Sequence, residues 1–145
     1  MPQKLFVAAA LVCEKVLQEK DDVPSIIRIV DTFTVTVPPD LPADAKSGIQ
    51  ITGFLAFKKA SLSTEPEKHH VAIRVRSPSG KEGPLQRVDL LLKAEPFAGT
   101  NVTLNMSHPI GEFGLFWIDV FLDDEEEPIT QIPFRLLEAP HIPIH

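Results

Sequence analysis

Hydrophobic and polar residues alternate along much of the chain, in runs about as long as a β-strand. The clearest run covers residues 25–37, where one face carries Ile27, Ile29, Phe33, Val35 and Val37. The other face carries Arg28 and three threonines, together with two further aliphatic residues. A period of two with many β-branched residues is typical of a β-strand. Asp31 interrupts the apolar face, which predicts a bend or a bulge there.

Further runs of strand length follow, separated by turn-forming or charged residues. They cover residues 49–58, 71–76, 85–93, 101–106, 113–122 and 129–137. The segment 77–84 is dense in turn residues, so we expect an antiparallel hairpin around it. The run 113–122 is apolar on both faces, which predicts a central buried strand, with 129–137 as its partner across an acidic turn. Pro133 cannot donate to a ladder, so we expect this last strand at a sheet edge or bulged.

The N-terminal segment allows two interpretations. Residues 5–12 can form a strand, whereas residues 8–20 have the propensity for a helix. We favour a strand that ends near Cys13, followed by a short irregular or helical stretch. The apolar run 5–13 also has some features of a secretory signal, but it is short, and Val12 stands where a signal peptidase needs a small residue. We therefore expect a first core element rather than a cleaved leader.

The whole pattern predicts an all-β fold, an antiparallel β-sandwich of about eight strands with Greek-key, immunoglobulin-like connections and at most one short helix. A closed barrel is the alternative. The length of 145 residues fits one domain. We place that domain at residues 1–138, followed by an extended C-terminal tail at 139–145.

Charge and cysteine content narrow the classes of function. The formal net charge is −6 and the isoelectric point is near 5.3. Mild acidity argues against nucleic acid or a membrane as the partner. The single cysteine, Cys13, permits no intrachain disulfide, which suits a reducing compartment, so we expect a cytoplasmic protein.

The motifs do not indicate an enzyme. Ser107 and His108 are adjacent, but neighbours on an extended chain point to opposite faces and cannot form a nucleophile–base pair. Residues 80–81 match part of a phosphate-binding loop, yet Val75 and Glu82 occupy the positions that need Gly and Ser/Thr. We therefore expect no catalytic residues and no cofactor.

Two clusters contain residue types that bind metals. The acidic turn offers Asp123, Asp124 and Glu125 as oxygen ligands for calcium, but we favour a charged turn that keeps the hairpin soluble. His69 and His70 are adjacent on an expected strand, so we expect them to point to opposite faces. A calcium-dependent domain or enzyme is therefore the alternative to a metal-free binding module.

Four basic residues are expected on the outward face of the hairpin, namely Arg74, Arg76, Arg87 and Lys93. Together they are our candidate binding site for a small anion or an acidic peptide. The alternative is cross-strand pairing with Asp89 on an ordinary polar face, which the overall acidity of the chain favours.

Several stretches resemble a known family. They are CEKVL at 13–17 and VPSIIRIVDTF at 23–33, followed by a hairpin around SPSG at 77–80 and by FGLFWIDV at 113–120. The first two resemble the opening of a family of small, uncharacterised, single-domain bacterial proteins, and the later two fit that family's layout. The resemblance implies a β-sandwich in a stand-alone bacterial or phage-associated protein. It implies no activity and no functional residues.

These observations favour a binding or protein-interaction module without catalytic activity. A free sheet edge can accept a strand from another protein or pair with a second copy, so we expect a protein partner or an edge-strand homodimer. The alternatives are the calcium-dependent domain and a structural subunit of a larger assembly. No motif specifies the ligand.

Overall fold

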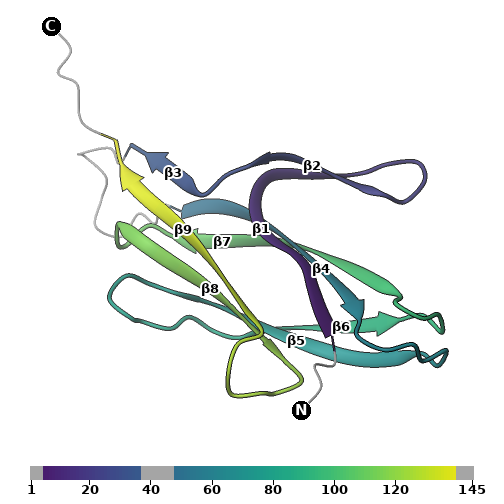
Figure 1. The fold of residues 1–145 in the computed structure, drawn as a ribbon. Coiled ribbons are helices and arrows are strands. Elements are labelled where there is room, and N and C mark those ends of the chain that lie inside the picture. Colours follow the sequence, from purple (N-terminus) through teal and green to yellow (C-terminus); the bar gives the residue numbers. More distant parts are fainter. Residues whose placement is uncertain (1–4, 37–47, 140–145) are drawn as a thin grey trace, which may run out of the picture.

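The computed structural model describes residues 5–36 and 48–139, which form nine β-strands and no helix (Figure 1). The strands are β1 (Leu5–Gln18), β2 (Pro24–Ile29), β3 (Thr32–Val35), β4 (Gly48–Lys59), β5 (Glu67–Arg76), β6 (Gln86–Leu92), β7 (Gly99–Pro109), β8 (Gly114–Leu122) and β9 (Thr130–Glu138). Within these ranges there is no helix of the length and apolarity that crossing a membrane requires. The predictions for Val37 and for most of the tail, 140–145, lie outside the described residues.

The strands form two separate sheets. The first sheet has the order β2-β1-β4-β7, and the second has the order β3-β9-β8-β5-β6. Neighbouring strands are antiparallel except β3 and β9, which run parallel. The all-β prediction is confirmed, while the immunoglobulin-like, Greek-key connection stays a prediction.

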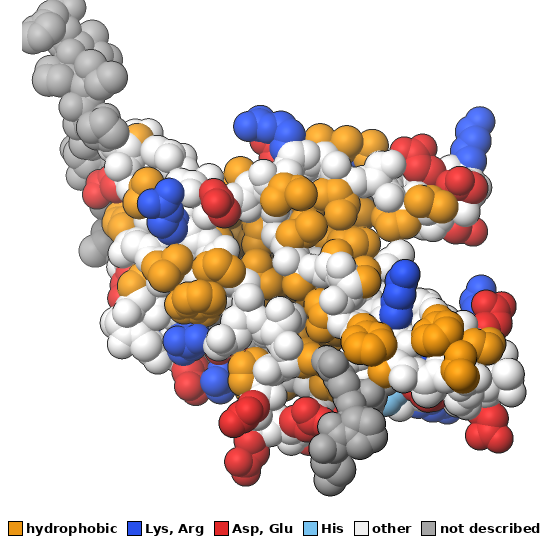
Figure 2. Space-filling model, viewed as in Figure 1, with side chains coloured by type: hydrophobic (Ala, Val, Ile, Leu, Met, Phe, Trp, Pro, Cys, Tyr) orange, Lys and Arg blue, Asp and Glu red, His pale blue; other side chains and the backbone are white. Residues whose placement is uncertain are grey.

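Side chains from both sheets meet in one hydrophobic core. The first sheet contributes Leu5, Val12, Ile51, Leu55, Phe57, Val102, Leu104 and Met106. The second contributes Val71, Ile73, Leu90, Leu92, Phe116, Ile118, Val120, Leu122, Ile132, Phe134 and Leu136. Burying each large apolar side chain contributes roughly 1.5–3 kcal/mol, so this core is the main stabilising feature. On the face in Figure 2, hydrophobic side chains also gather near the centre, with charged ones around them.

The first strand does not end near Cys13, as the propensities predicted, but continues to Gln18. Its first half pairs with β4 as far as Cys13, and its second half pairs with β2 from Cys13 onward. A register shift between Val7 and Ala9 marks a bulge in the first half. Backbone pairing with a second strand therefore overrides the helix propensity of residues 8–20.

The alternating run 25–37 forms two strands rather than one. β2 belongs to the first sheet and β3 to the second, so the chain passes from one sheet to the other near Asp31. Backbone hydrogen bonds fix both sides of this step: Val30 N donates to Val12 O at 2.9 Å, and Arg135 N donates to Asp31 O at 2.8 Å. Asp31, the polar residue on the apolar face, therefore marks the point where the chain leaves one sheet for the other. The sequence had predicted only a bend or a bulge there.

The last strand lies between two neighbours, so its prediction as an edge strand is wrong. β9 pairs with β8 on one side and with β3 on the other. However, β3 pairs with β9 only from Arg135 to Glu138. At Pro133, β9 is therefore paired with β8 alone. A residue without an N–H is tolerated at this position, because no strand on the other side needs its donor. The expected β5–β6 hairpin and the central position of β8 are both confirmed.

Candidate functional site

A cavity of about 380 Å³ opens between the two sheets, next to β5, β7 and β8. It lies beneath two loops, the β5–β6 loop at 77–85 and the β7–β8 loop at 110–113, which reach the same end of the molecule (Figure 1). The volume falls within the range of small-molecule sites, about 300–1,000 Å³. This cavity is our candidate functional site.

The deep wall of the cavity is apolar. It consists of Ile73 and Val75 from β5, Met106 from β7 and Phe116 from β8. These residues occupy the inward positions of their strands, so both sheets contribute to the wall. An apolar group of a ligand would therefore be shielded from water here.

One histidine belongs to this wall. His108 continues the inward alternation of Val102, Leu104 and Met106 along β7 and is half-buried. Its ring packs edge-on against Phe116, with centroids 5.1 Å apart and an interplanar angle of 81°. Burial lowers the pKa of His108 below its ordinary value, and the charge of Glu112 opposes this only in part. The ring is therefore neutral at physiological pH.

The ring nitrogens of His108 are available to a ligand. Within the part of the chain that the structure describes, neither nitrogen makes a hydrogen bond. In that part of the chain, every fully buried side-chain nitrogen or oxygen has a hydrogen-bond partner. The nitrogens of His108 have none, so they are accessible to solvent. A neutral imidazole offers one donor and one acceptor.

The two loops above the cavity are joined by hydrogen bonds. Ser79 donates to the Glu112 carboxylate from its backbone N–H at 3.2 Å and from its hydroxyl at 3.0 Å. Hydrogen bonds from Ser77 and Ser79 hold the pKa of Glu112 below its ordinary value. Gly80, with φ of 89°, completes the turn that presents Ser79. The Glu112 carboxylate thus connects the two loops, which form the rim of the cavity.

The rim also carries a lysine and an ion pair. Arg74 Nη1 lies 3.1 Å from Glu82 Oε2, so these two charges compensate each other. Lys81 is exposed and lines the cavity. It makes no ion pair within residues 5–36 and 48–139. Its charge helps to lower the pKa of Glu112, but its ammonium has no ion-pair partner at contact distance in those ranges.

The predicted basic patch divides into separate pairs. Arg74 and Arg76 both bind Asp119, at 3.3 Å and 3.2 Å, on the outer face of β5 and β8. Burial raises the pKa of the Asp119 carboxyl, but hydrogen bonds from Arg76, Gln131 and Arg74 outweigh burial, and the pKa is lowered. These guanidinium groups therefore bind a carboxylate of the protein itself.

The other two members of the patch lie apart from that network. Arg87 Nε is 3.4 Å from Asp89 Oδ1, and both side chains are exposed. Lys93 follows the end of β6 and is also exposed. This pair lies within β6, so Asp89 pairs with a basic residue of the patch along one strand and not across strands as the alternative to an anion site expected.

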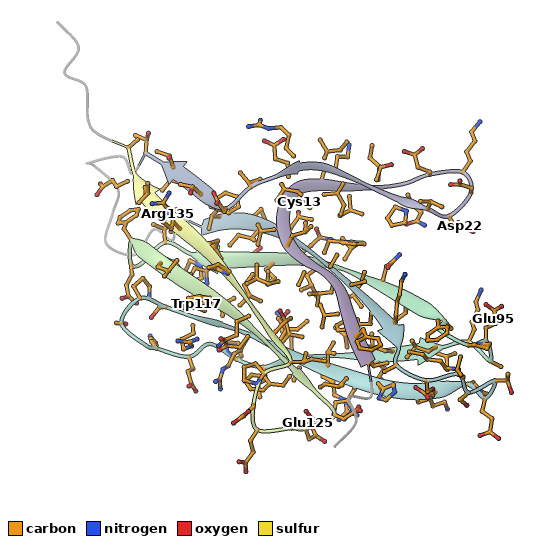
Figure 3. All side chains as sticks on the ribbon, in the orientation of Figure 1. Cys13, Asp22, Glu95, Trp117, Glu125 and Arg135 are labelled. Carbon is orange, nitrogen blue, oxygen red and sulfur yellow. The ribbon has the colours of Figure 1, made fainter. Side chains whose placement is uncertain are left out.

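The acidic turn faces the two adjacent histidines. His69 Nδ1 lies 2.6 Å from Asp123 Oδ2, and His70 Nε2 lies 2.9 Å from Asp124 Oδ1. His69 and His70 thus reach the same turn although their strand positions alternate. Glu125 is exposed near the tip of the β8–β9 turn (Figure 3). Among the described residues, no group of three or more acidic, histidine or cysteine side chains could hold a metal ion.

Ser107 and His108 lie on opposite faces of β7. The Ser107 hydroxyl accepts a hydrogen bond from Gln50 Nε2 at 2.6 Å, while the His108 ring packs on Phe116. A serine that faces away from the histidine cannot be activated by it.

Comparison with known proteins places this chain in a family. A model of the "Family of unknown function (DUF6941)" matches residues 8–137. The chain belongs to the DUF6941 family. Membership confirms the resemblance to small uncharacterised proteins. None of the curated proteins compared with this DUF6941 chain matches it.

A solved structure shares the fold of the DUF6941 chain. It is the Pseudomonas fluorescens alkylpurine DNA glycosylase AlkC bound to DNA containing an abasic site analogue. The TM-score is 0.56 at 10% sequence identity, over 92% of this chain and 30% of the glycosylase. The DUF6941 chain thus spans less than a third of that protein, and the likeness at this identity shows the fold alone.

This comparison corrects the exclusion of nucleic acid as a partner. The exclusion was based on the net charge of −6. A protein that contains the same fold is bound to DNA. Net charge is an average over the surface, whereas binding depends on where basic groups lie. The acidity of the DUF6941 chain is therefore no argument against nucleic acid.

The sequence did not identify His108, Lys81 or Glu112 as neighbours in one site. A signal for His108 was present, because it extends the inward alternation of 102–106 by one more step. Lys81 and Glu112 lie in two loops, and no local pattern shows that these loops meet.

Proposed function

We propose that this domain is a non-enzymatic binding module that takes up a small organic molecule in the cavity between its sheets. The observation that carries the proposal is the half-buried His108, whose ring nitrogens are open to an otherwise apolar wall. Binding sites commonly combine an apolar wall with a few polar groups that orient the ligand.

The surroundings of His108 favour binding over catalysis. The carboxylate of Glu112 is held by Ser79, and Ser107 lies on the opposite face of the strand. Within the described residues, no serine hydroxyl is hydrogen-bonded to the His108 ring, since Ser77 contacts Ser79 and Ser107 contacts Gln50. A neutral imidazole without such a partner is suited to hydrogen-bonding a ligand.

The proposal can be tested with 2-naphthamide, a neutral aromatic probe. We expect saturable chemical-shift changes at His108 and Phe116 in NMR spectra, with a dissociation constant on the order of 0.1–1 mM. Met106→Trp enlarges a buried side chain that lines the cavity, so it should abolish these changes. Leu91→Trp places the same side chain at an exposed position of β6 and should leave binding intact.

Gly111→Phe is a second blocking variant with less risk to folding. A Cβ atom at Gly111 meets no atom within 4 Å, so a side chain can begin there without disturbing the backbone. We expect weaker binding of the probe, because Gly111 lines the cavity mouth. Equal binding by the wild type, Met106→Trp and Gly111→Phe, with both variants folded, would reject the cavity as the site.

DNA is a second candidate partner. The support is the shared fold with a glycosylase that is bound to DNA containing an abasic site analogue. Fluorescence anisotropy of a labelled duplex with an abasic site analogue would test it. Salt-dependent binding would support this function, because neutralising phosphates releases counterions. No change in anisotropy at low salt would reject it.

A further inference from the structure

We propose that the ligand of the cavity is a small carboxylate with an apolar body, held by Lys81 and His108. This inference rests on the proposed function and specifies the chemical class of the ligand. The apolar body would lie against Met106 and Phe116, and the carboxylate would face the rim.

The first argument is that one charged side chain at the rim has no contact partner among the described residues. Four charged residues line the cavity: Arg74, Lys81, Glu82 and Glu112. Glu82 is paired with Arg74, and Glu112 accepts two hydrogen bonds from Ser79. Both carboxylates thus have partners, whereas Lys81 makes no ion pair with a described residue. The two cations and two carboxylates of the rim balance in number, and the charge of Lys81 acts on Glu112. The ammonium of Lys81 is nevertheless the charged group of the lining that is left to contact a ligand.

The second argument is the position of His108. Its ring lies on the wall beside Phe116, and its nitrogens have no hydrogen-bond partner in the described residues. One carboxylate oxygen can accept a hydrogen bond from the N–H of a neutral imidazole while the other oxygen binds a cation. Lys81 and His108 line one cavity from a loop and a strand, so one carboxylate could engage both.

The third argument is the apolar wall. A small inorganic anion would leave Met106 and Phe116 unused and would lose its hydration without compensation. An aromatic or aliphatic body on the carboxylate fills that part of the cavity and gains from burial. Of the two, the organic carboxylate fits both parts of the site.

The test compares 2-naphthoate with 2-naphthamide, which have nearly the same shape and differ in charge. Isothermal titration calorimetry should show that naphthoate binds about tenfold more tightly, as expected for a charge-assisted hydrogen bond. Lys81→Met should remove most of this preference, because it should weaken the binding of naphthoate much more than the binding of the amide. Lys93→Met, at an exposed lysine outside the cavity lining, is the matched control and should keep the preference.

His108 provides a second readout. A bound carboxylate stabilises the imidazolium form, so an NMR titration should show that naphthoate raises the pKa of His108 and naphthamide does not. The charged groups lining the same cavity, Arg74, Lys81, Glu82 and Glu112, are common to both measurements. His108→Phe retains ring packing on Phe116 and should weaken naphthoate binding.

The outcomes separate the two proposals. If the carboxylate and the amide bind equally well, the ligand class is wrong and the binding function stands. If naphthoate is preferred but Lys81→Met keeps that preference, the assignment of the carboxylate to Lys81 is overturned. If neither probe binds, the cavity is not a ligand site and both proposals fail.

Discussion

At the scale of single residues, the outer face of β8 carries a carboxylate that is almost completely buried. The side chain of Asp119 is 2% exposed although it points away from the core between the sheets. It is covered by the residues that bind it, Arg74 and Arg76 from β5 and Gln131 from β9. Asp119 thus joins three neighbouring strands by side-chain hydrogen bonds, in addition to their backbone ladders.

Asp119→Asn should therefore destabilise the fold. The substitution keeps the shape of the side chain but removes its charge, which leaves Arg76 without its carboxylate partner and Arg74 with Glu82 alone. We expect a loss of about 2–3 kcal/mol in the free energy of unfolding, measured by urea denaturation. Asp89→Asn removes an exposed partner of Arg87 and should change that free energy by less than about 0.5 kcal/mol. Equal effects of the two substitutions would contradict a structural role for Asp119.

His108 should make stability depend on pH. Its pKa in the folded protein lies below the ordinary value of 6.5, mainly because of burial. Between those two pKa values the unfolded chain binds more protons, so the free energy of unfolding falls as the pH is lowered through 6.5. We expect His108→Phe to lose less stability than the wild type when urea unfolding is compared at pH 7.5 and pH 5.5. All other titrating groups are common to both proteins, so an identical pH dependence would count against this assignment.

At the scale of elements, a buried lysine connects β4 to two loops. Lys59 is fully buried, and its ammonium donates to the backbone carbonyls of Ser63, Glu65 and Glu95. The first two carbonyls lie in the β4–β5 loop and the third in the β6–β7 loop. Three donors meet three acceptors, which satisfies the ammonium without a carboxylate.

Lys59→Met should loosen both loops. The variant retains the apolar stem but leaves three carbonyls without their donor, so we expect a loss of about 2 kcal/mol in unfolding free energy. Amide hydrogen exchange should accelerate at 60–66 and 93–98 more than in the strand centres. Lys58→Met, at the exposed neighbouring position, is the control and should alter neither quantity. Unchanged exchange in both loops would show that the ammonium does not hold them.

The elements also show what the sequence could predict. Alternation identified β4 to β9 to within a few residues, since each strand exposes one face to the core. It failed where a partner strand decides the conformation. β1 continues to Gln18 because β2 pairs with it there, and the run 25–37 divides because its halves join different sheets. Such pairings connect distant residues and leave no trace in a local pattern.

At the scale of the whole molecule, the candidate site forms where loops distant in sequence meet. Ser79 and Glu112 join the two loops above the cavity, and Lys81 and His108 line it from different elements. The sequence marked the 77–84 segment only as a turn, because turn residues report backbone conformation and not which loop lies opposite. The basic residues it grouped instead, Arg74 and Arg76, bind Asp119. Basic residues that share one face in the sequence pattern can therefore be bound to a buried carboxylate in the folded protein.

The same argument applies to the acidic turn and leads to a prediction for calcium. Asp123 and Asp124 are engaged with His69 and His70, and Glu125 extends into solvent from the turn. Calcium requires six to eight converging oxygen ligands. In the described ranges, no three acidic, histidine or cysteine side chains lie together in an arrangement that could hold a metal ion. We expect the melting temperature to be the same in millimolar calcium and in EDTA, because a ligand stabilises a fold only through differential binding to it. A rise of several degrees with calcium, lost in Asp124→Asn, would restore the calcium-dependent alternative. The control is magnesium at the same concentration, which reports screening of the net charge of −6 without a calcium site.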